Sequence, residues 1–298
     1  MSLDYVLQQI VNGITLGSMY ALVAVGFSMI YGIMRLINFA HGDIVMIGAF
    51  LTLYFLEILG LPLLVVGVIV LVFGFIVGIL VERSIFYPMR GSPQVTGFIA
   101  SLALSIMLQN TGILLLSAQP RNFNFPEEML VSINIGNISF KTLDLVIIIT
   151  TILLMIALLL LVNKTKLGIA IRATAQNLDV ARMMGININR TIMLTFAIGS
   201  SIAAIAGLMW GGKFGQIDPL MGYVPGLKAF VAAVIGGVGS IPGAILGGFI
   251  LGISEVLFVG LLPPEYSTYR DAFVFTILIV ILIVMPNGLL GKDIEERA

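Results

Sequence analysis

Long apolar runs recur along the whole sequence and restrict its fold more than any other feature. A helix needs about 20 apolar residues to cross the hydrocarbon core of a bilayer. Because a helix satisfies its own backbone hydrogen bonds in lipid, each long run predicts a membrane-spanning helix. Eight runs qualify, at residues 11–34, 44–60, 62–81, 95–117, 142–162, 191–212, 242–262 and 271–290. We therefore expect an all-α polytopic membrane protein, with residues 1–298 forming a single transmembrane domain.

The composition agrees with lipid as the solvent and narrows the possible functions. Charged residues make up only 10% of the chain, against roughly 25% in soluble proteins. The sequence has no cysteine and one histidine, His41, so we expect no disulfide, no metal site and no cofactor. The net charge is zero, so nothing indicates nucleic-acid binding.

A nucleotide-binding loop is also not expected. Gly207 to Lys213 matches the start of a P-loop, but Phe214 follows where the motif needs Ser or Thr to hold magnesium. No grouping of nucleophile and base stands out elsewhere in the sequence. We therefore expect no ATPase motif in this chain and no enzyme activity.

Two stretches interrupt the series of spans. Residues 227–239 are apolar but too short to cross a bilayer comfortably, so they form either a short tilted crossing or half of a broken helix. The following Gly- and Pro-rich stretch, 235–248, breaks the helix, and it lies either near a transport pathway or in a plain interhelical turn. Residues 118–141 alternate in polarity and predict a small hairpin.

The longest polar interruption, 164–190, predicts two short helices. It holds five of the fifteen basic residues. The first helix is expected at about 166–175. Asn177 is a suitable N-cap for the second, and Gly185 is a natural residue to end it. This segment is either a docking surface on the cytoplasmic side or an ordinary cytoplasmic loop held there by its charge.

Basic residues also predict the orientation, because they are retained on the cytoplasmic side. With the 163–190 loop inside, we favour nine crossings, eight long and one short, and an outside N-terminus. The basic residues then expected inside, besides those of the loop, are Arg35, Arg83, Arg90, Lys292 and Arg297. Those expected outside are Arg121, Lys141, Lys213, Lys228 and Arg270.

Polar groups within or beside the spans are candidates for function. A charge at the centre of a membrane helix costs about 2.5–3.5 kcal/mol on insertion scales, so such groups face a cavity or a partner. Asn38, His41 and Asp43 cluster near one span end, where they either line a pathway or simply satisfy an interfacial turn. Glu255 lies deeper in its span and is expected to face the bundle.

Glycines spaced four residues apart recur in the spans. This spacing places small residues on one helix face and lets helix backbones approach closely. The pattern predicts a compact bundle, from the pairs Gly13 and Gly17, Gly74 and Gly78, Gly207 and Gly211, Gly243 and Gly247, and Gly248 and Gly252.

Four blocks of sequence carry a family resemblance that covers essentially the whole chain. They are residues 12–50, 168–190, 226–255 and the closing MPNGLLG of 285–291. In this order they resemble the LivH-type permease subunits of bacterial branched-chain amino acid ABC importers. The resemblance implies an inner-membrane permease that forms half of a translocation pathway. Its expected partners are a second, LivM-like permease chain, two cytoplasmic ATP-binding subunits and a periplasmic substrate-binding protein.

The resemblance also implies roles for particular residues. The block in the polar loop would be the element that couples to the ATPase, with small residues for close approach and arginines that pair with carboxylates. Its residues are Arg172, Ala173, Thr174, Ala175, Asn177, Ala181, Arg182 and Gly185. The translocation pathway would involve Asn38, His41, Asp43, Gly236, Gly237, Gly239 and Glu255.

Alternative functions remain open from the sequence. Families for urea, short amides or other amino acids look similar, and a pathway with few fixed charges would suit those solutes too. An ion-coupled secondary transporter also uses broken helices with Gly and Pro. Against that alternative stand the small number of ionisable groups in the spans and the folded polar loop.

Overall fold

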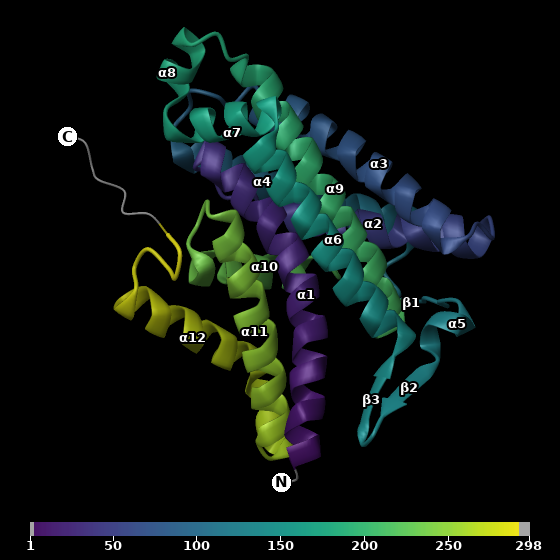
Figure 1. The fold of residues 1–298 in the computed structure, drawn as a ribbon. Coiled ribbons are helices and arrows are strands. Elements are labelled where there is room, and N and C mark those ends of the chain that lie inside the picture. The colour runs from purple at the N-terminus through teal and green to yellow at the C-terminus, as the bar shows by residue number, and fades with distance from the viewer. Residues whose placement is uncertain (1–2, 292–298) are drawn as a thin grey trace.

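The computed structural model describes residues 3–291, and it shows a bundle of long helices (Figure 1). Within the described residues, eight helices are long and apolar enough to cross a membrane. Each coincides with an expected run, which confirms the all-helical fold. They are α1 (Leu3–Met34), α2 (His41–Leu53) with a π-helical end (Tyr54–Ile58), α3 (Leu63–Val81) with a π-helical end (Glu82–Phe86), α4 (Gln94–Leu116), α6 (Thr142–Lys164), α9 (Ile188–Phe214), α11 (Ile241–Leu261), and α12 (Arg270–Val284) preceded by a 3-10 turn (Pro264–Tyr269).

Helices α1 and α9 form the buried centre of the bundle. The α1 helix packs along α11, and α9 packs along α3. Glycines mediate these contacts, as their spacing predicts. A Cβ atom at Gly17 would lie 2.8 Å from the Cα of Phe249, and one at Gly78 would lie 2.7 Å from the Cα of Ala197. Side chains larger than hydrogen would therefore push the helices apart.

Small elements occupy the two ends of the bundle (Figure 1). At one end, here called the hairpin end, strands β2 (Ser132–Ile135) and β3 (Ile138–Lys141) pair antiparallel, as expected for 118–141. The short helix α5 (Glu127–Leu130) and the two-residue strands β1 (Arg121–Asn122) and β4 (Gln216–Ile217) lie there too. At the opposite end, the loop end, lie the short helices α7 (Lys166–Gln176) and α8 (Leu178–Met183).

Two helices begin part-way along the bundle rather than at either of its ends. The α2 helix starts at His41, whose ring lies against Gly26 of α1. The α10 helix (Tyr223–Gly236) starts beside it. A Cβ atom at Gly42 would lie 2.8 Å from the Cα of Gly226 and would collide with the carbonyl of Gly222. Only glycine permits this backbone contact, which brings the N-termini of α2 and α10 together.

The stretch 227–239 is thus a short helix that starts within the bundle and ends near its loop end. Gly239 packs against Gly32, close to the C-terminus of α1. At the other end of the next helix, the Tyr5 hydroxyl donates to the carbonyl of Gly260, so α11 runs antiparallel to α1. Because α9 and α11 run in the same direction, the chain between them crosses the bundle, as the ninth crossing requires.

One basic residue does not lie where charge counting placed it. Lys228 was expected in an outer loop, but it is on α10 and is only 3% exposed. Its partner Glu255 lies 27 residues further along the chain, so local hydropathy could not reveal the pairing. Arg35 and Arg90 follow helices that end at the loop end, and Arg83 lies in the π-helical end of α3, together with the basic loop. Lys292 and Arg297 lie outside the described residues.

Candidate functional site

The helices α7 and α8 form a compact unit at the loop end. The Asn177 side chain caps α8 by accepting hydrogen bonds from the backbone N–H groups of Asp179 and Val180, each at 3.0 Å. Gly185 follows with a φ of +81°, a left-handed conformation that suits glycine at a helix end. These features confirm the helix boundaries expected from the sequence.

The inner face of this unit packs against the bundle. Ile171, Thr174 and Ala181 are buried, and α7 contacts α1, α6 and α9. A Cβ atom at Gly168 would collide with the carbonyl of Val162, so glycine permits α7 to turn back tightly against the end of α6. The unit therefore follows any movement of the helices on either side of it.

Its outer face differs from the expected docking face. Thr174 and Ala181, two residues of the expected coupling block, are buried inside the unit, and Ala173 and Ala175 are partly buried against the core. The small residues thus serve packing within the chain. The exposed side chains form an apolar surface, here called the α8 tip, with Met183 83% and Met184 78% exposed. The α8 tip consists of Leu178, Val180, Met183 and Met184.

Arg172 is partly engaged within the chain. Its Nη1 donates to the backbone carbonyl of Val162, in the last turn of α6. A cation there satisfies one of the free carbonyls of the helix end and opposes its negative dipole. Arg172 therefore ties α7 to α6, whereas Arg182 is exposed on α8 beside the tip.

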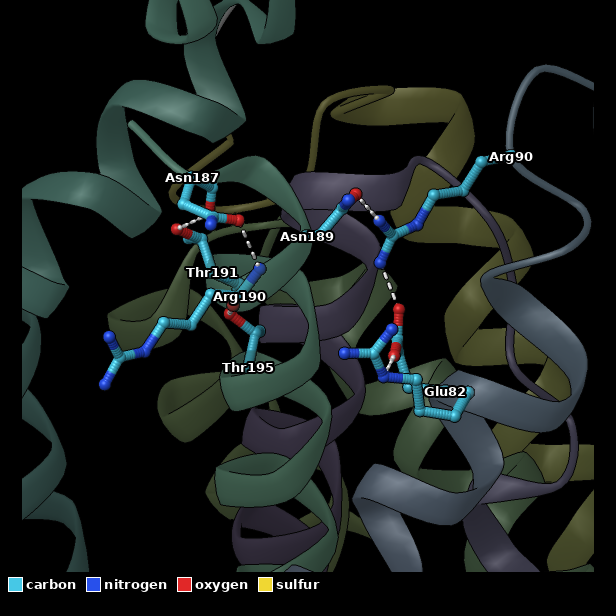
Figure 2. Close-up of polar contacts among 8 residues, drawn as sticks. Glu82, Arg90, Asn187, Asn189, Arg190, Thr191 and Thr195 are labelled. Atoms are coloured by element: carbon cyan, nitrogen blue, oxygen red, sulfur yellow. Dashed lines mark hydrogen bonds and ion pairs between the residues drawn. The ribbon is translucent and has the colours of Figure 1, made fainter. Parts of the chain in front are cut away.

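A buried ion pair lies beside the start of α9 (Figure 2). Glu82, at the π-helical end of α3, is fully buried and accepts a hydrogen bond from Nη2 of Arg90. The other terminal nitrogen of Arg90 donates to Oδ1 of Asn189 on α9. Burial lowers the pKa of Arg90, and the neighbouring Glu82 opposes this effect. The pair connects α3, the loop before α4 and the first turn of α9.

Side-chain hydrogen bonds connect the end of the polar loop to the first turns of α9 (Figure 2). Asn187 caps the helix by accepting from the backbone N–H of Arg190 at 3.0 Å. The hydroxyl of Thr191 donates to the Asn187 carbonyl, and that of Thr195 donates to the Thr191 carbonyl. The connection from α8 to α9 is therefore short and hydrogen-bonded, which suits it to transmit motion. Sequence reasoning missed Glu82, Arg90 and Asn189 as a group, because Asn189 lies 99 residues from Arg90 in the chain.

The first group of expected pathway residues gathers where α2 and α10 begin. Asn38, His41 and Asp43 are all buried. Oδ1 of Asp43 accepts a hydrogen bond from Nε2 of Gln109 on α4 at 3.0 Å. Both side-chain atoms of Asn38, both ring nitrogens of His41 and Oδ2 of Asp43 have no hydrogen-bond partner. Buried polar atoms are nearly always partnered, so this cluster needs an explanation beyond packing.

The second group forms the tight turn from α10 to α11. Gly236 ends α10, and Gly237 and Gly239 have φ angles of +105° and +84°. The C-terminal segment packs on this turn, since the backbone N–H of Leu289 donates to the carbonyl of Ile235 at 2.9 Å. These glycines are therefore required by a close-packed turn at the loop end, and they do not meet Asn38, His41 or Asp43.

The third expected position, Glu255, belongs to a buried ion cluster. Its Oε1 lies 2.7 Å from Nζ of Lys228 and 3.1 Å from Nε of Arg270. Its Oε2 accepts a hydrogen bond from the hydroxyl of Tyr20 at 2.9 Å. Glu255 faces the bundle, as expected, and the cluster joins α1, α10, α11 and α12. Helix α10 contacts all three groups, because it starts at the first, ends at the second and carries Lys228 into the third.

These features define a class of protein. No group of three or more His, Asp or Glu side chains in residues 3–291 is arranged to hold a metal ion. Helices that begin within a membrane bundle, beside buried polar groups, are characteristic of solute permeases. The fold and its polar interior are those of a polytopic membrane permease.

Comparison with known proteins gives the family. The model of the family described as "Branched-chain amino acid transport system / permease component" matches residues 9–283. The chain therefore belongs to this family of transport-system permeases. It is 41% identical to the high-affinity branched-chain amino acid transport system permease protein LivH of Escherichia coli (strain K12), over 98% of each chain.

Two further relatives are similar to different extents. The chain is 38% identical to the permease protein BraD of Pseudomonas aeruginosa, over 98% of this chain and 97% of that protein. It is 40% identical to the xylose transport system permease protein XylH of Escherichia coli over 112 residues, which cover 34% of this chain and 28% of that protein. Comparison with solved structures found no match.

Proposed function

We propose that this chain is the permease subunit of an ATP-driven importer and forms half of the pathway for branched-chain amino acids. The observation that carries the proposal is the α7–α8 unit, which is fixed to the bundle on one face and exposes the apolar α8 tip on the other. The basic residues of the loop end favour the cytoplasmic side of a bacterial inner membrane for this unit. An exposed apolar surface rimmed by charge is the usual form of a protein docking site.

The proposed partner subunits supply functions that this chain does not carry. The sequence has no P-loop, so ATP hydrolysis belongs to two cytoplasmic subunits that dock at the α8 tip. A second, LivM-like permease chain would complete the pathway, and a periplasmic binding protein would deliver the solute. The relatives LivH and BraD are named as permeases of high-affinity branched-chain amino acid transport, which supports this choice of substrate.

The proposed mechanism uses the contacts at the loop end. Closure of the ATPase pair moves the α7–α8 unit. Arg172 transmits the motion to α6, and the capped start of α9 transmits it to the centre of the bundle. Arg90 links the same turn of α9 to Glu82 of α3. The bundle then changes between outward-open and inward-open states.

An ion-coupled secondary transporter is disfavoured by the state of Glu255. Such a transporter needs a carboxylate that exchanges protons or ions during transport. Glu255 is instead held between Lys228 and Arg270 and by the Tyr20 hydroxyl. A carboxylate fixed by two cations is suited to hold helices together.

Reconstitution tests the proposal directly. The chain is placed in proteoliposomes with its ATPase subunits, its partner permease and the binding protein, and uptake of radiolabelled leucine is measured with and without ATP. We expect accumulation only when all components and ATP are present. Accumulation against a gradient by this chain alone would refute the proposal.

A further inference from the structure

A small cavity lies where α2 and α10 begin. It has a volume of about 40 Å³ and is lined by α1, α4, α10 and the segment before α2. A water molecule needs roughly 10–15 Å³ on this measure, so the cavity has room for a few waters or for one carboxylate group. Two of its lining residues, Leu102 and Tyr223, are exposed. The cavity is therefore reached from the surface between α4 and α10.

Asn38 is the polar side chain that stands out in this cavity. It is only 2% exposed, it lines the cavity, and neither Nδ2 nor Oδ1 has a hydrogen-bond partner. An amide buried in this way loses its water contacts without compensation. The Asn38 side chain is not needed for the turn before α2. That turn is made by the backbone, with the N–H of His41 donating to the Asn38 carbonyl. A bound polar group in the cavity would satisfy it.

The charge around the cavity indicates the kind of group. Helix N-termini carry positive potential and favour anions. At the N-terminus of α2, the carboxylate of Asp43 in the first turn already offsets this positive potential. The first turn of α10 has no acidic residue, and Tyr223, Gly226 and Leu227 of this end line the cavity. The positive end of α10, with no carboxylate in its first turn, therefore faces the same space as the Asn38 amide.

The carboxylate of Asp43 on α2 is connected to the cavity through two side chains of α4. Ser105 lines the cavity, and Gln109 donates both to Ser105 at 3.1 Å and to Asp43 at 3.0 Å. Oδ2 of Asp43 has no partner. Asp43 does not itself line the cavity, so the charge that faces the Asn38 amide is the positive end of α10, which suits a carboxylate.

We propose that this cavity is a subsite of the pathway that binds the α-carboxylate of an amino acid, with Nδ2 of Asn38 as its hydrogen-bond donor and the positive N-terminal end of α10 as its electrostatic partner. The inference rests on the proposed function, because it requires that amino acids pass this point. It adds a recognition step within the permease, in addition to the selection made by the binding protein.

The absence of cysteine in the sequence permits a direct test. Leu102→Cys places a single thiol at the cavity, and Leu114→Cys places one on an 84% exposed part of the same helix. In the purified full complex, each thiol is labelled with an anionic and a cationic thiosulfonate. We expect the anionic-to-cationic rate ratio to be several-fold higher at position 102. L-Leucine and 4-methylpentanoate should slow labelling there, and 3-methylbutylamine, which lacks the carboxylate, should not.

Substitution of Asn38 gives a second readout. Loss of one hydrogen bond to a charged group reduces binding about tenfold or more, so Asn38→Leu should lower leucine uptake about tenfold while the ATPase activity of the assembled complex persists. Asn38→Asp should lower uptake further, because it repels a carboxylate. Thr151→Val is the matched control, since Thr151 is also buried with an unpartnered hydroxyl but lies on α6, away from the cavity.

The outcomes separate this inference from the proposed function. The carboxylate subsite would be overturned if 3-methylbutylamine slowed labelling of Leu102→Cys as much as L-leucine does, or if no ligand slowed it. Unimpaired transport by Asn38→Asp would also overturn it. If the Asn38 variants do not assemble, the labelling of Leu102→Cys decides alone. Absence of ATP-driven uptake by the unsubstituted complex would instead refute the proposed function.

Discussion

Lys228 of α10 and Glu255 of α11 form an ion pair with 2.7 Å between Nζ and Oε1, and both side chains are almost completely buried. The pair lies among apolar helices, where an isolated charge is costly. Asp271 and Arg270 at the start of α12 extend it, at 3.0 Å from Lys228 and 3.1 Å from Glu255. The cluster therefore fixes the half-helix α10 relative to α11 and α12.

Replacing one member of this ion pair should destabilise the folded chain much more than replacing both members together. Lys228→Met or Glu255→Gln leaves a buried charge without its main partner, which typically costs about 3–5 kcal/mol. The double variant should recover a large part of that loss. Thermal unfolding of the detergent-solubilised chain measures the effect, with Glu265→Gln as an exposed control. Additive losses in the double variant would show that the two residues are not coupled.

The α8 tip should determine affinity for the ATPase subunits. Burying a methionine side chain contributes about 1.5–3 kcal/mol, so Met183→Asp and Met184→Asp should each weaken docking by tenfold or more. Membrane insertion should be unaffected. Co-purification with the ATPase subunits measures docking, and Val131→Asp, an exposed apolar position at the hairpin end, is the control. Unchanged co-purification of both tip variants would exclude this surface.

Arg172 should be needed for coupling because it holds α7 to the end of α6. Arg172→Glu is expected to weaken substrate-stimulated ATPase activity and uptake while the chain still inserts in the membrane. It places a negative charge beside the carbonyls of the α6 C-terminus, which disfavours that contact. Arg172→Lys keeps the charge but loses the planar fork and should be intermediate. Full activity of Arg172→Glu would contradict this role.

The buried Glu82–Arg90 pair should transmit motion between α3 and α9. Glu82→Gln leaves Arg90 partly buried beside an uncharged neighbour and should destabilise the chain by about 1–3 kcal/mol. We also expect uptake to fall more than ATPase activity, because the ATPase contact is intact. The ratio of solute transported to ATP hydrolysed measures this uncoupling. Glu128→Gln, at an exposed position in α5, should leave the ratio unchanged.

The contact between α2 and α10 should not tolerate any side chain. A Cβ atom at Gly42 meets the backbone of Gly222 and Gly226, and overpacking of this kind costs about 1–3 kcal/mol. Gly42→Ala should therefore lower both stability and transport. Gly67→Ala is the matched control on α3, where a Cβ atom meets nothing within 4 Å. That change should be neutral or slightly stabilising, since alanine favours a helix interior.

The sequence was sufficient for features that depend on local chemistry. Apolar runs located the eight long spans, and Asn177 and Gly185 located the ends of α8 because capping depends on a few adjacent residues. The N-terminal end of α1 was placed eight residues too late. Its polar start is stabilised by a distant strand, with Gln8 exchanging hydrogen bonds with Ser139 of β3.

Features that depend on distant contacts could not be derived in this way. The burial of Lys228 requires Glu255, 27 residues further along the chain, and the hydrogen bond of Arg90 requires Asn189, 99 residues further along. The inward orientation of Ala181 depends on how the α7–α8 unit packs on the bundle, which helical spacing in so short a segment does not specify. The resemblance to a family indicated the loop as a coupling element but not which face of it is exposed.

The glycine contact between α2 and α10 has a mechanical consequence. From their shared starting point, α2 leads to Glu57, which accepts a hydrogen bond from the backbone N–H of Asn124, and α10 leads to the turn where Gly239 packs against Gly32. With backbone against backbone, no flexible side chain can absorb a displacement at this point. A displacement of α10 at this contact would therefore be passed directly to the start of α2. In a transport cycle, we expect these two helices to move together at their starting points.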